Sequence, residues 1–310
     1  MIISKTPFRV SLFGGSTDYE SHYKNNGATL IGFAMDQYCH LAVRKTPKIF
    51  GNTTKIIYSK TEIVEDNSTI QHNGVRGVLQ YLDIKYGIEI SHMSDLPAQT
   101  GIGSSSSFIV GLLNACYTLD GIKKTPHELA SEAIYIERIL LGEAGGIQDQ
   151  IFASFAGLNS IHISKSGDFE VRPIPVGEKF LKEFLRRSIL VYTGNTRESY
   201  EVAQSHCGKE KDGIGEIVNA AMKAFYTQDL DTVGVLLDRT WQAKKRISSL
   251  ISNEAVDKIY AELRSAGMIG GKLLGAGGSG FIFGILKDGC EFSHPNQIPV
   301  GLAKHGSIIL

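Results

Sequence analysis

A glycine- and serine-rich turn followed by a long apolar run most constrains the fold of this 310-residue chain. The stretch PAQTGIGSSSSF spans residues 97–108 and follows a short extended segment, and the apolar run FIVGLLNACYTL continues from Phe108. The pattern predicts a strand, a loop and a helix that begins near Ser104. Backbone N–H groups of Gly101, Ile102, Gly103 and Ser104 would then point into one space at the positive end of the helix dipole, which suits an anion.

The loop therefore predicts a phosphate site made from main chain, although it lacks the lysine of a Walker A loop. Serine hydroxyls could also reach a magnesium ion, which prefers oxygen ligands. The alternative is a serine N-cap on an ordinary helix. The residues that we expect to bind the nucleotide are Pro97, Gly101, Ile102, Gly103, Ser104, Ser105, Ser106 and Ser107.

Strands and helices alternate along the chain without the regular cadence of a doubly wound sheet, which favours an α+β protein in two halves. Residues 28–45 predict two strands, 125–142 a helix capped by Thr125 with Pro126 at its first position, and 210–267 a mostly helical region. Proline and glycine interrupt the pattern between Pro173 and Arg187. We therefore expect domains at 1–180 and 181–310.

A second glycine-rich segment, GAGGSG at 275–280, fits the dinucleotide pattern GxGxxG. That fingerprint needs a helix after its last glycine. Here FIFGIL follows, which predicts a strand, so we do not expect a dinucleotide fold.

Composition narrows the classes of partner. Lys plus Arg and Asp plus Glu are both 32, and the balanced charge argues against nucleic acid as a partner. The four cysteines form no CxxC pair, which predicts reduced thiols rather than structural zinc or a disulfide framework. We find no signal peptide and no run of 18 apolar residues, so we expect a cytoplasmic protein without a membrane partner.

Two acidic residues follow the phosphate loop. Glu137 lies on a predicted helix, and Asp149 comes twelve residues later, after a pair of glycines. If the chain folds back at the glycines, one carboxylate could hold magnesium and the other could accept a proton from a substrate hydroxyl. A solvated helix face is the alternative for each.

Arg9 and Asp18 bracket the first glycine turn, in RVSLFGGSTDY. Thr17 and Asp18 could bind sugar-like hydroxyls, and Arg9 could offset charge at a reacting group. A plain hairpin with an Asp turn is the alternative. Lys244 and Lys245 lie near Trp241 on a predicted helix. They could form a solvated helix face or a site for a phosphate carried by the substrate.

Together these motifs resemble those of the GHMP kinases, the superfamily of galactokinase, homoserine kinase and mevalonate kinase. PAQTGIGSSSS is similar to the family's second motif, and KLLGAGGSGFIF to its third, a turn that supports the phosphate loop through Gly275, Gly277 and Gly278. RVSLFGGSTDY resembles galactokinase's RVNLIGEHTDY, and GGIQDQ its GIMDQ. The resemblance implies a two-domain α+β fold, with an N-terminal half like ribosomal protein S5 domain 2 and a ferredoxin-like C-terminal half.

The resemblance also implies roles for single residues. Asp149 matches the proposed base, Arg9 the motif-one arginine, and Ser105 and Glu137 the magnesium ligands, with ATP and Mg2+ as cofactors. Asp18 matches the aspartate that binds the sugar. The other residues expected around the acceptor in these two motifs are Gly14, Gly15, Ser16, Thr17 and Gly146.

One departure from galactokinase concerns the acceptor. Gly15 and Ser16 replace Glu-His, which removes a contact to the sugar's terminal hydroxymethyl group and opens space. The segments YTGNTR, WQAKK and GGKLLGAGG are similar to those of bacterial D-glycero-D-manno-heptose 7-phosphate kinases. That similarity makes Arg197, Lys244 and Lys245 candidates for binding a charged tail.

The expected function is thus phosphorylation of the anomeric hydroxyl of a sugar or sugar phosphate, with heptose 7-phosphate first, for nucleotide-activated heptose and surface polysaccharide synthesis. A GHMP kinase for a galactose-, fucose- or mevalonate-like acceptor is the alternative. A non-catalytic regulator that binds ATP or a sugar is a further one, and a homodimer stays open.

Overall fold

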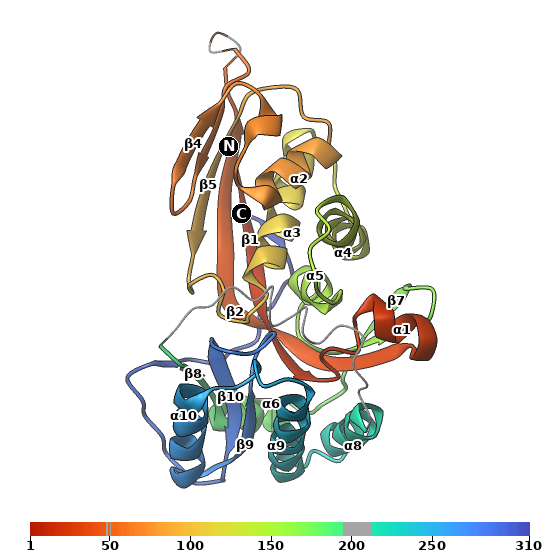
Figure 1. Ribbon diagram of the computed structural model, residues 1–310, viewed down its shortest axis with the longest axis vertical. Helices are drawn as coiled ribbons and strands as arrows, with labels where there is room; N and C mark the ends of the chain where they lie inside the picture. The colour runs from red at the N-terminus through yellow and green to blue at the C-terminus, as the bar shows by residue number, and fades with distance from the viewer. Residues whose placement is uncertain (48, 50, 195–212) are drawn as a thin grey trace.

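The computed structural model describes residues 1–47, 49, 51–194 and 213–310. Its upper part in Figure 1 holds the first sheet, the helices that cover it and both chain termini. The lower part holds the second sheet. This mixture of sheets and helices confirms the α+β class.

The first sheet has eight strands, and most of them pair antiparallel. Its main path runs β12-β1-β2-β5-β3-β4, while β6 pairs with β2 and with β7. The strands are β1 (Ile2–Phe13), β2 (Ala28–Lys45), β3 (Thr54–Ile57), β4 (Thr61–Val64), β5 (Ile88–Ser94), β6 (Leu158–Ile163), β7 (Phe169–Pro173) and β12 (Ile308–Ile309).

Residues 28–45 form one long strand, so the prediction of two strands was wrong. Different parts of β2 have different partners: residues 28–33 pair with β6, and residues 39–45 pair with β5. The β1–β2 register shifts between Pro7 and Arg9. An alternating sequence cannot distinguish two short strands from one strand with such an irregularity. The shift places Arg9 where β2 passes from one pairing partner to the other.

Helices cover one face of the first sheet (Figure 1). The first-half helices are α1 (Glu20–Asn26), α2 (Asn73–Tyr81), α3 (Ser104–Leu119), α4 (Pro126–Tyr135) and α5 (Gln148–Ser154). Thr125 accepts a hydrogen bond from the Glu128 amide, and Glu128 bonds back to the Thr125 amide. This capping box confirms the predicted start of the helix at Pro126.

The second sheet has four antiparallel strands in the order β11-β8-β10-β9. Its strands are β8 (Ser188–Tyr192), β9 (Met268–Leu273), β10 (Phe281–Leu286) and β11 (Gln297–Ile298), and its helices are α6 (Glu178–Arg187), α8 (Ile214–Tyr226), α9 (Leu230–Ile247) and α10 (Glu254–Ser265). The strand β10 follows GAGGSG directly, as predicted, so that segment lacks the helix of a dinucleotide fingerprint.

A shared core joins the two parts. Phe33 of β2 makes edge-to-face contacts with Phe184 of α6 and Phe283 of β10, at centroid distances of 5.8 and 5.9 Å. Each such pair adds about 1 kcal/mol beyond the burial of its area. The last strand, β12, also returns to pair with β1 of the first sheet. The division at 180/181 stays a prediction.

Candidate active site

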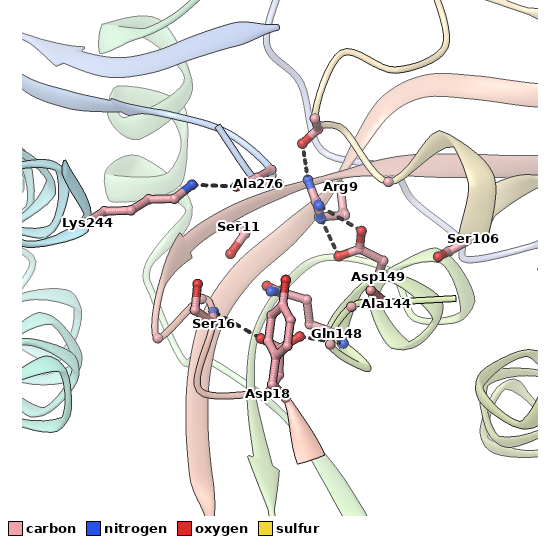
Figure 2. Close-up of a pocket in the computed structure, with 18 of the residues that line it drawn as sticks. Arg9, Ser11, Ser16, Asp18, Ser106, Ala144, Gln148, Asp149, Lys244 and Ala276 are labelled. Atoms are coloured by element: carbon pink, nitrogen blue, oxygen red, sulfur yellow. Dashed lines mark hydrogen bonds and ion pairs between the residues drawn. The ribbon is translucent and has the colours of Figure 1, made fainter. Parts of the chain in front are cut away.

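A cavity of about 230 Å3 opens between the two parts. Its wall comes from β1 and the turn after it, the loop before α3 and its first turn, the chain between α4 and the first turn of α5, and parts of α8, α9, β9 and the turn after β9. Figure 2 shows side chains from these elements converging. The predicted site residues that line it are Arg9, Gly14, Gly15, Ser16, Asp18, Gly101, Gly103, Ser104, Ser105, Ser106, Glu137, Gly146, Asp149, Lys244 and Gly275.

Arg9 and Asp149 form a bidentate ion pair at the centre of this wall (Figure 2). Arg9 Nε donates to Asp149 Oδ1 at 2.8 Å, and its Nη2 donates to Oδ2 at 2.7 Å. Arg9 is 4% exposed and also donates to the Gly101 carbonyl. The guanidinium thus fixes the carboxylate beside the predicted phosphate loop. Each carboxylate oxygen has a second lone pair available to a substrate hydroxyl.

The loop before α3 has the predicted form. Gly101 and Gly103 both have positive φ, and Gly103 is the residue that precedes the helix, so the cap is not a serine side chain. Ser104 and Ser105 line the cavity, and amide groups of a first helical turn lack partners within the helix. The remaining predicted residues do not line the cavity but form hydrogen bonds within or next to the loop. Ser107 Oγ donates to the Pro7 carbonyl, and the Ile102 carbonyl accepts from the Arg9 backbone amide. The Pro97 carbonyl accepts from Thr100 Oγ1.

The second glycine-rich turn packs directly on this loop. A Cβ on Gly275 would overlap the Cα of Gly101, and one on Gly280 would overlap the Thr100 carbonyl. Gly277 and Gly278 instead pack against Ile251, whose carbonyl accepts from the Gly278 amide at 2.9 Å. Contact with the predicted phosphate loop therefore comes from Gly275 and from Gly280, which the sequence analysis did not single out.

Glu137 lies on a π-helical turn, Ile136–Leu140, that continues α4. Leu141 donates to the carbonyl of Ile136, five residues back. Such turns are often found at functional sites. Glu137 is 1% exposed and accepts hydrogen bonds from Ser106 Oγ at 2.8 Å and from Gln150. Burial raises the pKa of Glu137 to about 7.

Glu137 and the neighbouring serines could supply some of the oxygen ligands of a magnesium ion. Mg2+ prefers oxygen ligands and is often bound by one or two carboxylates together with substrate phosphates. Glu137, which lines the cavity, would supply the carboxylate. The described residues contain no cluster of three or more His, Cys, Asp or Glu side chains. The serine whose hydroxyl donates to Glu137 is Ser106, whereas Ser105 is exposed on the cavity wall. Both hydroxyls are therefore candidates for the role predicted for Ser105.

The turn after β1 fixes Asp18. Its carboxylate accepts from the amides of Ser16 at 3.1 Å and Gln148 at 3.2 Å, which ties the turn to the start of α5. Gly146 is required here, because a Cβ on it would overlap the Asp18 carboxylate. Thr17 donates its hydroxyl to the Gly14 carbonyl, so it braces the turn. Asp18 and Asp149 thus face one cavity.

Lys244 and Lys245, which were predicted together as candidates for binding a charged tail, lie in different surroundings. Lys244 is 9% exposed, lines the cavity and donates to the Gly275 carbonyl. Burial, reinforced by the charges of Lys272 and Arg9, holds the pKa of Lys244 well below its usual value. Lys245 points elsewhere, to Asp257 at 3.3 Å and over the Trp241 ring. Arg197 lies outside the described residues.

The cavity lining also contains residues that the sequence analysis did not identify, among them Lys272, Ser11 and Gln148. Lys272 of β9 is 4% exposed and donates to the carbonyls of Ser11 at 2.9 Å and Leu12 at 3.2 Å. Burial lowers the pKa of Lys272 to about 7. A lysine inside an otherwise apolar strand, in GGKLL, was the signal that could have indicated Lys272.

Two family models match the chain in the order that its motifs predict. The model of the GHMP kinases N terminal domain matches residues 73–157, and the GHMP kinases C terminal model matches 221–289. In the described part of the chain no helix is long and apolar enough to span a membrane.

Curated relatives include kinases for different acceptors. A D-glycero-alpha-D-manno-heptose 7-phosphate kinase of Campylobacter jejuni is 28% identical over 301 residues, which cover 91% of this chain and 88% of that protein. A mevalonate kinase of Pyrococcus abyssi is 24% identical over 326 residues, with coverage of 92% and 88%.

Solved structures confirm the two-domain fold. A D-glycero-D-manno-heptose 1-phosphate kinase from Bacteroides thetaiotaomicron has a TM-score of 0.78 at 20% identity, covering all of this chain and 99% of that one. A Lactococcus lactis galactokinase complexed with galactose has a TM-score of 0.72 at 17% identity, with coverage of 92% and 85%. With both family models in order and this fold, the chain belongs to the GHMP kinases, phosphotransferases with an alcohol group as acceptor.

Proposed function

We propose that the protein transfers the γ-phosphoryl group of ATP to the anomeric hydroxyl of a sugar, with D-glycero-D-manno-heptose 7-phosphate as the first candidate. The product would be the 1,7-bisphosphate, for nucleotide-activated heptose and surface polysaccharide synthesis in the cytoplasm. The observation that most supports this is the Arg9–Asp149 pair, which lies against Gly103 of the phosphate loop. In this proposal the base and the phosphate-binding loop share one cavity.

In this proposal the loop holds the ATP phosphates. Amide groups of Gly103, Ser104 and Ser105 at the start of α3 would donate to phosphate oxygens, aided by the helix dipole. Gly275 presses on Gly101 and keeps the loop in shape. Glu137, with Ser105 or Ser106, would hold Mg2+, which supplies positive charge to the phosphates during transfer.

Asp149 would act on the acceptor. As the acceptor oxygen bonds to the γ-phosphorus, the bond to the bridging β–γ oxygen breaks, ADP leaves, and the hydroxyl proton moves to an Asp149 oxygen. Arg9 orients that carboxylate through two hydrogen bonds and places positive charge near the reacting group. Asp18, held by two backbone amides, would orient the sugar by accepting from its hydroxyls.

Two observations support heptose 7-phosphate as acceptor. Gly15 puts no side chain into the cavity wall, which leaves that position free for a group of the acceptor. Lys244 is buried in the wall of the same cavity, and its ammonium group would pair with a phosphate on the acceptor. The match to the Campylobacter jejuni heptose 7-phosphate kinase over 91% of the chain agrees with both. The similarity to a mevalonate kinase over 92% of the chain supports a different acceptor as the second candidate.

The test is an acceptor panel at equal concentration with ATP and magnesium. It compares the heptose 7-phosphate with the dephosphorylated heptose, galactose, fucose, mannose and mevalonate. A preference of at least tenfold in kcat/KM for the 7-phosphate, corresponding to about 1.4 kcal/mol, would support the proposal. Preference for a neutral sugar would remove the heptose assignment but keep the sugar kinase. Preference for mevalonate, or ATP binding without any transfer, would overturn the proposed function.

A further inference from the structure

Three polar side chains surround the place that a side chain on residue 15 would occupy. A Cβ added to Gly15 would lie 3.3 Å from Ser11 Oγ, 3.8 Å from Gln148 Nε2 and 4.0 Å from Lys272 Nζ. All four residues line the cavity, and they come from β1, the turn after it, α5 and β9. The glycine thus leaves a small polar recess, which we call the Gly15 recess.

The recess contains hydrogen-bonding atoms that lack partners. Ser11 is 4% exposed and Gln148 is 8% exposed, yet Ser11 Oγ and Gln148 Oε1 have no hydrogen-bond partner within the described residues. Buried polar atoms are nearly always paired, since an unpaired one costs about 1–3 kcal/mol. Figure 2 labels both side chains in the cavity, with Gln148 beside Asp18. The unpaired hydrogen-bonding atoms of Ser11 and Gln148 therefore indicate that a ligand binds here.

The mixture of donors and acceptors decides the chemistry of that ligand. Ser11 can donate or accept, Gln148 offers an acceptor oxygen and donor hydrogens, and Lys272 in its charged form has a third N–H beyond the two that bind carbonyls. A phosphate only accepts, so it would leave Gln148 Oε1 unpaired. The Asp18 carboxylate, which accepts a hydrogen bond from the Gln148 backbone amide, would also repel a phosphate. A hydroxyl group both donates and accepts and matches all three side chains.

We infer that Ser11, Gln148 and Lys272 form a subsite for a hydroxyl group of the acceptor, next to the part of the sugar that Asp18 orients. This inference rests on the proposed function, since it needs a polyhydroxylated acceptor. It makes the three side chains binding residues that set acceptor specificity. It also gives Gly15 a second role, because any side chain there would take the place of the substrate hydroxyl.

The test uses Ser11→Ala, Gln148→Met and Gly15→Ala in the full-length protein, assayed with the sugar that the wild type phosphorylates best. Each variant should raise the acceptor KM roughly 3- to 30-fold, as expected for losing a hydrogen bond or leaving a buried group unpaired, while the ATP KM stays within twofold. Gly15 has no positive φ, so alanine there tests the recess without backbone strain. Acceptor binding without ATP, measured by calorimetry, should weaken in parallel.

Ser4→Ala is the matched control. Ser4 is a fully buried serine on the same strand whose Oγ also lacks a partner within the described residues, but it lies outside the cavity lining. It should leave the acceptor KM unchanged. The double variant Ser11→Ala with Gln148→Met should lose less than the sum of the single effects, because both side chains bind one hydroxyl.

The outcomes separate this inference from the proposed function. If the wild type phosphorylates no sugar in the panel, the proposed function fails, and the subsite fails with it. If it phosphorylates a sugar but the variants keep a normal acceptor KM, or raise the ATP KM equally, only the subsite is overturned. An equal rise of the acceptor KM in Ser4→Ala would also overturn the subsite, because the effect would then follow from the loss of any buried serine hydroxyl on this strand.

Discussion

Gly275 lies so close to Gly101 that a Cβ on Gly275 would overlap the Cα of Gly101, which brings two loops 174 positions apart in the chain into direct contact. One loop begins α3, and the other joins β9 to β10. The predicted phosphate loop of the first part thus packs directly against a turn of the second part. Changes in either turn should affect nucleotide binding.

Gly275→Ala should weaken ATP binding roughly tenfold or more, because the added methyl group would displace amides that are placed to form charged hydrogen bonds. ATP KM and thermal unfolding are the measurements. Gly289→Ala is the control: Gly289 has a similar positive φ of 72°, but nothing lies within 4 Å of its added Cβ. Equal ATP KM values for the two variants would show that contact with Gly101 is unimportant.

Gly146→Ala should raise the acceptor KM roughly tenfold or more, since its Cβ would push the Asp18 carboxylate out of its hydrogen bonds. The ATP KM should change little, as Asp18 is assigned to the acceptor. Gly215→Ala on α8 provides a control, because an added Cβ there meets nothing within 4 Å. An unchanged acceptor KM in Gly146→Ala would remove Asp18 from the binding role.

Lys244→Met and Lys245→Met should behave differently although the residues are adjacent. Lys244 is buried in the cavity wall, and its loss should lower kcat/KM for a phosphorylated acceptor roughly tenfold or more. Lys245 pairs with the partly exposed Asp257, so its loss should leave kcat/KM within about twofold. Similar losses in both variants would contradict the placement of Lys244 alone at the substrate.

Lys272 should make stability depend on pH. Its pKa is lowered by burial to about 7 from an ordinary 10.5, with Arg9 adding to the shift and Asp18 opposing it. Between these two values the folded state binds fewer protons than the unfolded state, so the free energy of unfolding should rise with pH. The cost is fully present below about pH 7 and disappears above 10.5.

Lys272→Met should therefore flatten the rise in stability between pH 7 and 10, whatever its effect at a single pH. Denaturant unfolding without ligands at pH 7, 8, 9 and 10 measures the slope. Lys244, whose pKa is also lowered, should leave part of the slope in the variant. If the free energy of unfolding rises equally with pH in the variant and the wild type, a pKa of about 7 for Lys272 is contradicted.

Local signals predicted much of the fold. The Thr125 capping box, the GIGSSSS loop and the strand after GAGGSG are all short-range patterns, and the structure has each where the sequence indicates it. The single strand at residues 28–45 was not predicted, because a register shift depends on the partner strands and not on the alternation within one segment.

Sequence motifs predicted which residues line the site, but not which of their side chains form hydrogen bonds with one another. The sequence indicated that Glu137 and Asp149 would face one cavity, and both line it. It could not show that Ser106 rather than Ser105 bonds to Glu137, because the π-helical turn sets which way that carboxylate points. Nor did it indicate Ser11 or Gln148, whose unpaired atoms become visible only when β1 and α5 are packed together.

The most direct test of the account is Asp149→Asn, assayed in single turnover with saturating ATP and the preferred sugar. Asparagine keeps the size of the side chain and a bond to Arg9 but cannot accept the hydroxyl proton, so the transfer rate should fall roughly 100-fold or more with ATP and acceptor affinities retained. Asp168→Asn, at an exposed turn, is the control. Transfer at a near-normal rate in Asp149→Asn would contradict the role of Asp149 as the base.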